Sequence, residues 1–242
     1  MTNAIRSELL RSMSGLSIVP VYLIALLMPA FVLFSDGGRL ELAGLDSGAA
    51  TTLLLQPLAW SAIAAAFVGA YGVTRECYYT SLERTLTAVG YRDSFIGKLV
   101  AGALAAVAVS AVIMAVWTAG VGFFLARNGL APVLTPDAWR IYSGALGGAV
   151  LGALLGGAVG WITRNYYVTA AVVLVVPMVV EFALLRTAPE VATYSPGLVL
   201  AALSVPGHQG RLLDSLPALG VGLAWTVASI AVAWVCGRRR RV

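Results

Sequence analysis

The chain has 242 residues, of which 60% are hydrophobic and only 11% are charged. A soluble domain carries roughly 25% charged residues, and a soluble fold of this size still exposes about a third of its unfolded surface to water. The composition therefore excludes a soluble globular protein and indicates an integral membrane protein. The net charge of +5 is explained by membrane topology, and it requires no nucleic-acid partner.

The first predicted element is a short amphipathic helix over residues 2–14. Ile5, Leu9 and Met13 recur at intervals of four residues, with charged side chains between them. We expect this helix to lie in the membrane interface with its apolar face toward lipid. A frayed N-terminal tail is the alternative.

Six later segments are apolar enough, and long enough, to form membrane-spanning helices. A helix needs about 20 apolar residues to cross the hydrocarbon core, and membrane helices tolerate internal proline and glycine. The alternating ten-residue segments of an outer-membrane barrel are absent. The predicted fold is thus an all-α, polytopic membrane protein with one transmembrane domain over residues 1–242. Its spans are 16–34, 51–73, 99–125, 141–163, 168–185 and 216–236.

The basic residues predict how these spans are oriented. With the N-terminus inside, eleven of the 16 lysines and arginines fall in inner segments, including the run Arg238–Arg241. This bias follows the positive-inside rule and places both termini in the cytoplasm. Alanine, glycine, valine and arginine are favoured over isoleucine and lysine, which is typical of a GC-rich bacterium. The predicted location is therefore the bacterial cytoplasmic membrane.

The polar stretch "TRECYYTSLERTLTAVGYRD", residues 74–93, lies between the second and third spans and carries six charged residues. The whole inner segment, 75–98, is far longer than a simple connector requires. Read as a helix, it has an apolar side and an opposite charged side. The apolar side holds Tyr78, Leu82, Leu86 and Val89. The charged side could dock a partner protein, whereas a plain connector would need its charges only to stay out of the bilayer.

The fourth span carries a glycine at every fourth position. Small residues allow helix backbones to approach closely, which is how helices associate in lipid. Because four residues exceed one turn of 3.6, the stripe winds around the helix. We expect it to pack against two successive neighbours or one steeply crossing helix, and we interpret it as packing instead of a substrate path. The stripe consists of Gly144, Gly148, Gly152, Gly156 and Gly160.

A short apolar segment, 195–207, precedes the last span. Ser195 followed by Pro196 is a helix-start signal. The apolar core of this segment is too short to cross the membrane, but its length suits a re-entrant helix. The sequence predicts a helix that dips into the outer leaflet from outside.

Glu181 is the one acidic residue inside a predicted span. A carboxylate within the membrane is a candidate functional group, because burying it without a partner is costly. It could line a substrate path or gate. It could equally form an ion pair with Arg140, Arg186 or Arg211, or be solvated near the interface.

This layout resembles the type-2 (ABC-2) permeases of ATP-binding-cassette exporters. In that family the loop after the second span often reads as a Glu, then Gly-Thr four or five residues later, a Leu-rich stretch, and a Lys before the third span. This chain has Glu76, then Thr80-Ser81 in place of Gly-Thr, then "LERTL" and Lys98. The Thr-Ser replacement is a departure from the family pattern.

The resemblance implies a subunit without catalytic residues of its own. The loop would be a coupling helix docking on one of two ATPase subunits, and segment 195–207 would form the outer gate. A second permease subunit would complete a homodimer or heterodimer. ATP and Mg²⁺ would bind the partner, since Gly97-Lys98 lacks a P-loop around it. The docking residues would be Arg75, Glu76, Tyr79, Thr80, Glu83 and Arg84.

The expected cargo is a hydrophobic or amphipathic drug, peptide or lipid, because the spans carry few polar groups. No metal site or bound cofactor is expected in this chain. Two rival classes remain. An ion-coupled secondary transporter usually needs several charged residues in its spans. An integral membrane enzyme needs clustered carboxylates or histidines, and this chain has a single histidine.

Overall fold

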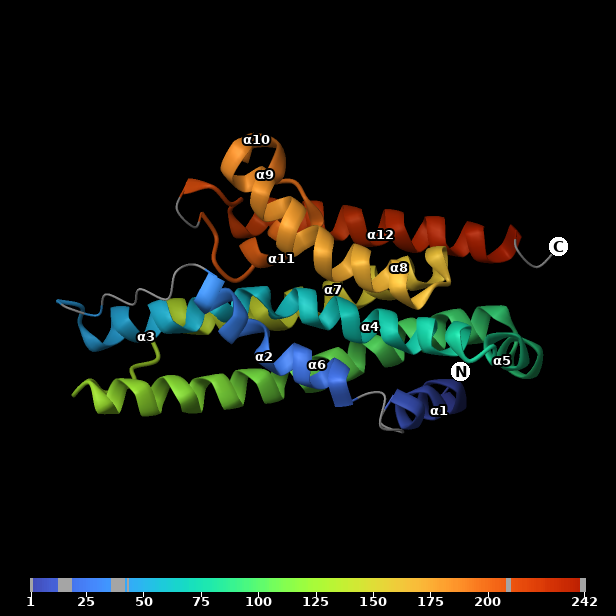
Figure 1. Ribbon diagram of the computed structural model, residues 1–242, viewed down its shortest axis with the longest axis horizontal. Coiled ribbons are helices and arrows are strands. Elements are labelled where there is room, and N and C mark those ends of the chain that lie inside the picture. The colour runs from blue at the N-terminus through green and yellow to red at the C-terminus, as the bar shows by residue number, and fades with distance from the viewer. Residues whose placement is uncertain (1, 13–18, 36–41, 43, 208–209, 240–242) are drawn as a thin grey trace.

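The computed structural model describes residues 2–12, 19–35, 42, 44–207 and 210–239, and every regular element within these ranges is helical (Figure 1). Within the described ranges, five helices are long and apolar enough to cross a membrane. They confirm an all-helical fold of the membrane-embedded kind. Their bounds are Ser47–Tyr78, Tyr91–Arg127, Pro136–Thr163, Tyr166–Thr187 and Ser215–Arg239.

The first predicted span, 16–34, is described only from residue 19 onward. Helix α2 (Val19–Ser35) has 17 residues, fewer than the roughly 20 that a span requires. Residues 16–18, where the prediction began, lie outside the described residues. A sixth span therefore remains a prediction. The N-terminal helix α1 (Thr2–Ser12) occupies the predicted range 2–14 except for residues 13 and 14, which are also not described.

Two spanning segments change helix type near a proline. The second predicted span begins as α3 (Ser47–Leu55), tightens to the 3₁₀ turn η2 (Gln56–Trp60) and continues as α4 (Ser61–Tyr78). The fifth predicted span consists of α8 (Tyr166–Ala170), the π-helical η3 (Ala171–Glu181) and α9 (Phe182–Thr187). Proline lacks the N–H that the regular helix ladder uses, so the backbone bonds around it must rearrange.

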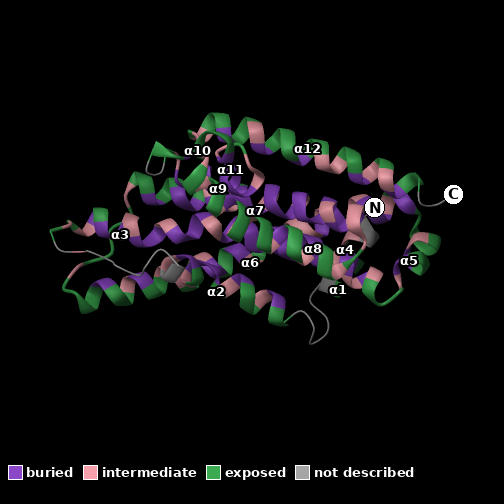
Figure 2. Cartoon of the chain, turned by 45° about the horizontal axis from the view of Figure 1, so that its top comes forward, coloured by how far each residue is buried: buried purple, intermediate pink, exposed green. Residues whose placement is uncertain are grey.

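Helices α4 and α7 (Pro136–Thr163) form the centre of the bundle, as the purple ribbons of Figure 2 show. In the span formed by α3, η2 and α4, 83% of the residues in its 18-residue apolar stretch are buried. In α12 (Ser215–Arg239), only 17% of the residues in the corresponding stretch are buried. Large apolar side chains such as Leu216, Phe123 and Val179 are correspondingly exposed. An apolar outer surface of this extent needs lipid to cover it.

The glycine stripe of α7 meets two neighbours in succession. Near its start, a Cβ on Gly144 would strike the backbone of Leu203 and Ser204, just after the short helix α11 (Pro196–Ala202). Further along, a Cβ on Gly156 would strike the carbonyl of Ala66 in α4. A Cβ on Gly148 would meet both neighbours, Ala62 of α4 and Leu200 of α11. On Gly152 and Gly160, an added Cβ would meet the α4 carbonyls of Ala62 and Ala70 respectively.

The bundle has two distinct ends (Figure 1). Helix α5 (Leu82–Val89) lies at the same end as α1 and the last turn of α12, and we name this the α5 end. Helices α3, α10 (Pro189–Ala192) and α11 lie toward the opposite end, named here the α11 end. Helix α6 (Tyr91–Arg127) runs between the two ends.

Candidate functional site

Segment 75–98 is three helical pieces, whereas the sequence pattern predicted one helix. Helix α4 ends at Tyr78, α5 spans Leu82–Val89, and α6 starts at Tyr91. Thr80 has φ 53° and Gly90 has φ 85°, and these left-handed conformations end α4 and α5 respectively. The predicted apolar face is therefore broken. Tyr78, at the end of α4, is 57% exposed.

Helix α5 is held to the bundle by its apolar side. Leu82 is buried and Leu86 is partly buried, and both belong to a cluster with Phe95 of α6 and Trp161 of α7. The ring of Trp161 is fully buried, with its centroid 5.3 Å from that of Phe95. This packing gives α5 a fixed position on the bundle.

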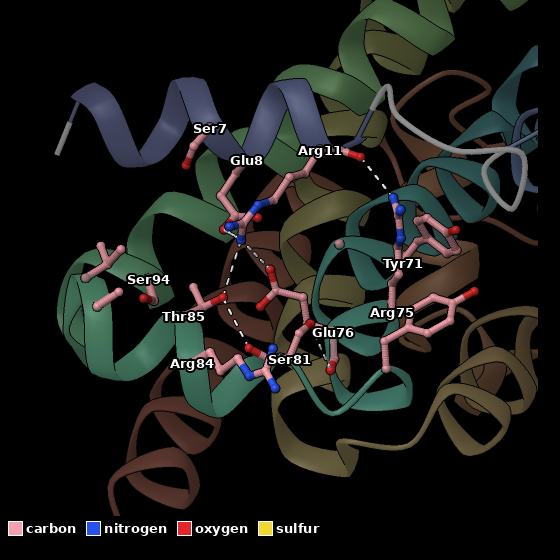
Figure 3. Close-up of a pocket in the computed structure, with 14 residues that line it drawn as sticks. Ser7, Glu8, Arg11, Tyr71, Arg75, Glu76, Ser81, Arg84, Thr85 and Ser94 are labelled. Carbon is pink, nitrogen blue, oxygen red and sulfur yellow. Dashed lines mark hydrogen bonds and ion pairs between the residues drawn. The ribbon is translucent and has the colours of Figure 1, made fainter.

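A buried group of charges ties α1 to the same place (Figure 3). Lys98 Nζ of α6 lies 2.8 Å from Glu8 Oε2 of α1 and 2.9 Å from Glu76 Oε1 of α4. Arg11 Nη1 lies 2.8 Å from the same Glu76 oxygen and donates to Thr85 Oγ1 of α5 at 3.3 Å. We call Glu8, Arg11, Glu76 and Lys98 the ion network.

The ion network is electrically balanced, with two carboxylates and two cations. Lys98 is 2% exposed, Glu76 is 7% and Glu8 is 8%. Charges buried to this extent are tolerated only when they are paired and hydrogen-bonded, and removing one member leaves the others uncompensated. The network therefore holds α1, α4, α5 and α6 in one arrangement.

The sequence pattern indicated only part of this network. Glu76 and Lys98 were noted as motif residues, but Glu8 and Arg11 were missed as their partners. Glu8 and Arg11 are three residues apart, so they share one face of α1 and lie 3.5 Å apart. Their partners are 65 or more residues distant in the chain, which a local pattern does not reveal.

The six predicted docking residues divide into two groups. Arg75 is partly buried and donates to the Arg11 carbonyl at 2.9 Å, and Glu76 lies inside the ion network. These two side chains hold the loop to α1. The other four are exposed on the surface, and they are Tyr79, Thr80, Glu83 and Arg84.

A cavity of about 520 Å³ lies between α1, α4, α5 and the start of α6 (Figure 3). Glu8, Arg11 and Glu76 of the ion network form part of its wall. Arg84 and Tyr79, which are exposed, contribute to the lining as well. The buried network and the exposed loop surface therefore adjoin the same cavity.

Glu181 has a different environment at the α11 end. It is 2% exposed, and its two carboxylate oxygens accept hydrogen bonds from the backbone N–H groups of Gly197 and Leu198, at 3.2 and 2.9 Å. These are the first N–H groups of α11, which a helix leaves unpaired. Glu181 thus caps α11, and no described arginine forms an ion pair with it.

The helix start predicted at Ser195 and Pro196 is in the structure, but its cap is a different residue. Ser195 takes the N-cap position without a capping hydrogen bond from its side chain. Glu181, which comes from the preceding span, accepts the hydrogen bonds in its place. A Cβ on Gly197 would lie 2.9 Å from Pro177 Cβ, so glycine is what lets η3 approach α11.

No protein-family model matches the chain, and neither a curated protein nor a solved structure is similar to it. Among the described residues, no group of three or more His, Cys, Asp or Glu side chains could hold a metal ion. The candidate site is therefore defined by its own geometry: a rigidly held loop with an exposed polar surface beside a charged cavity.

Proposed function

We propose that this chain is a permease subunit of an ABC-2 type exporter in the bacterial cytoplasmic membrane. Six spans with cytoplasmic termini would form half of the path for a hydrophobic or amphipathic substrate. A second permease, identical or related, would form the other half. Two separate ATPase subunits would bind ATP and Mg²⁺ and drive transport.

The attachment of α5 to the bundle is the observation that carries this proposal. A coupling element must receive force from a partner and pass it to the spans without deforming. Helix α5 is packed on α6 and α7 through Leu82 and Leu86, and the ion network links it to α1 and α4. A flexible connector would need neither the packing nor the buried charges.

The exposed side of the same loop provides a surface for the partner. Tyr79 is 58% exposed, and Glu83 and Arg84 are exposed beside it. An aromatic ring next to charges of both signs is typical of a protein interface. In this proposal these side chains contact a groove on the ATPase subunit, while Arg75 and Glu76 position the loop from inside.

The α11 end supports a gate in the same proposal. Helix α11 has seven residues and is followed by a turn back toward α12, as a re-entrant segment requires. Glu181 joins it to the fifth span. Because η3 is π-helical around Pro177, this span has a natural point for bending during transport.

Capture of an ATPase subunit tests the proposal. The tagged protein would be purified in mild detergent from cells of its source, and co-purifying proteins would be identified by mass spectrometry. We expect an ABC ATPase with the native chain and its loss from the double variant Glu83→Arg, Arg84→Glu. Both residues are exposed on α5, so the variant is expected to fold.

A matched control uses another exposed pair of opposite charges. Asp137 and Arg140 lie on α7 near the α11 end and are 3.3 Å apart. The swap Asp137→Arg, Arg140→Asp should leave ATPase capture unchanged. Failure of the native chain to capture any ATPase would refute the exporter assignment, and equal loss in both double variants would refute the assigned docking surface.

A further inference from the structure

The cavity at the α5 end has the size and depth of a small-molecule site. Its volume of about 520 Å³ falls within the range of roughly 300–1,000 Å³ for ligand pockets. Tyr71 and Gly72 form part of its wall. They precede the end of α4 by about two turns, or roughly 10 Å, so the cavity extends into the bundle from the α5 end.

The charge of the cavity wall favours an anionic group. Three arginines line it, Arg11, Arg75 and Arg84, against two carboxylates, Glu8 and Glu76. Lys98 is outside the lining and forms ion pairs with both carboxylates. Arg84 is exposed and forms no ion pair with the described residues. A guanidinium in that position is well suited to a phosphate, which it can bind through two parallel hydrogen bonds.

Two buried polar atoms of the lining lack a partner among the described residues. They are Glu76 Oε2 and Ser94 Oγ, on side chains of residues that are 7% and 2% exposed. An unpaired buried carboxylate oxygen is costly, and a hydrogen-bond donor would relieve that cost. The interior of the cavity therefore calls for an N–H or O–H group, while its rim calls for an anion.

We propose that this cavity binds the headgroup of a phospholipid whose phosphate carries a hydrogen-bond donor. Ethanolamine and glycerol headgroups meet both requirements, with the phosphate at Arg84 and the ammonium or hydroxyl group at Glu76 and Ser94. A choline headgroup has the phosphate but no donor. The inference does not depend on the exporter assignment.

A lipid is favoured as the source of this headgroup by helix α1. Leu10 of α1 is 63% exposed, on an amphipathic helix whose charged side forms the cavity wall. An amphipathic helix of this kind lies at the boundary between headgroups and acyl chains. A headgroup in the cavity would therefore sit at its normal depth, with its acyl chains beside α1.

Native mass spectrometry of the purified, delipidated protein in detergent tests the inference. The probes are phosphatidylethanolamine, phosphatidylglycerol and phosphatidylcholine with identical acyl chains, together with free phosphoethanolamine and glycerol 3-phosphate. We expect the first two lipids to bind about tenfold more tightly than phosphatidylcholine, because one charge-assisted hydrogen bond has that effect. Neither free ester should compete.

Three variants assign the binding to this cavity. Arg84→Gln removes the phosphate partner and should weaken all three lipids about tenfold. Ser94→Ala should reduce the preference over phosphatidylcholine. Ala88→Trp, from an exposed lining position of α5, should fill the cavity and abolish the binding. Thr87→Trp, exposed on α5 but outside the lining, is the control and should leave binding intact.

Other outcomes would overturn the inference. Equal binding of the three lipids would remove the role of Glu76 and Ser94, and binding that survives Ala88→Trp would place the lipid elsewhere. Free esters that bind as tightly as the lipids would assign the site to a soluble phosphate ester. Loss of ATPase capture in Ala88→Trp with unchanged lipid binding would show that a protein side chain fills the cavity.

Discussion

The two ends of the bundle each bury a glutamate, but they satisfy it by different means. At the α5 end, Glu76 faces two cations, Arg11 and Lys98, at 2.8 and 2.9 Å. At the α11 end, Glu181 faces two backbone N–H groups of α11 and no described cation. One carboxylate is balanced by charge and the other by hydrogen bonds alone.

This difference determines how each end should respond to change. The ion network joins four helices through side chains, so its stability depends on keeping positive and negative charges equal. The Glu181 cap joins two segments through backbone groups, so it depends on the position of the carboxylate and on close packing at Gly197. Substitutions that alter charge should act most at the α5 end, and those that alter shape should act most at the α11 end.

The largest effect is expected from Lys98→Met. The Lys98 side chain is fully buried, and its loss leaves Glu8 and Glu76 with only Arg11 between them. Removing one member of a buried ion pair costs about 3–5 kcal/mol, which is a large part of the stability of a typical domain. Thermal unfolding in detergent would measure the loss, with Arg92→Met, an exposed cation on the same helix, as the control.

A second substitution separates charge from packing at this position. The double variant Glu8→Gln, Lys98→Met is again neutral, because Glu76 keeps Arg11. We expect it to recover more than half of the lost stability, which a double-mutant cycle would quantify. If the double variant is as unstable as Lys98→Met alone, the shape of the lysine and not its charge holds the α5 end together.

Glu181→Gln should have the next largest effect. The amide keeps one acceptor oxygen, but its NH₂ group faces a backbone donor, so one charge-assisted hydrogen bond is lost at a cost of about 1.5–3 kcal/mol. Hydrogen exchange at the amides of Gly197 and Leu198 should rise. Glu190→Gln, an exposed acid on α10, should leave that exchange unchanged. Unaltered protection in Glu181→Gln would mean that the cap does not fix α11.

Gly197→Ala tests the role of shape at the α11 end. The new methyl would lie 2.9 Å from Pro177 Cβ and would also press on the Glu181 carboxylate. Overpacking of this kind costs about 1–3 kcal/mol. Gly147→Ala on α7 is the control, because a Cβ there meets nothing within 4 Å and should be neutral or stabilising. Equal stability of the two variants would exclude a close packing requirement at Gly197.

The sequence predicted those features of the bundle that depend on local pattern. Apolar run lengths located the five long helices of the described ranges. The spacing of Gly144 to Gly160 predicted close packing against two successive neighbours or one steeply crossing helix, and the structure has the two neighbours. The start of α11 followed from Ser195 and Pro196. Each of these signals lies within a few residues of the structure that it predicts.

Features that depend on distant contacts could not be predicted in this way. Glu8 meets Lys98 across 90 residues, and Glu181 accepts the capping hydrogen bond of Gly197 from 16 residues away. Both arrangements follow from how helices are placed beside each other, which is information that no single helix contains. The cavity between α1 and α5 has the same origin, since neither helix forms it alone.

The smallest expected effect, and the one with a distinctive sign, comes from Thr80→Gly. Thr80 holds φ 53° in the turn between α4 and α5, which costs a residue with a Cβ about 1–2 kcal/mol. Glycine avoids this cost. It also increases the conformational entropy of the unfolded chain, which lowers the free energy of unfolding by up to about 1 kcal/mol, so a net increase in stability of about 0.5 kcal/mol should remain. Thr87→Gly, inside α5, should instead lose about 1 kcal/mol.

Thermal unfolding of the two variants would compare the same Thr→Gly substitution at two exposed positions seven residues apart. Opposite signs would show that position 80 is selected by its backbone conformation. A loss of stability in both variants would instead mean that the Thr80 side chain, which donates to the Tyr79 carbonyl at 2.8 Å, is what the turn requires. The α5 end would then owe its geometry to side chains in the loop as well as in the ion network.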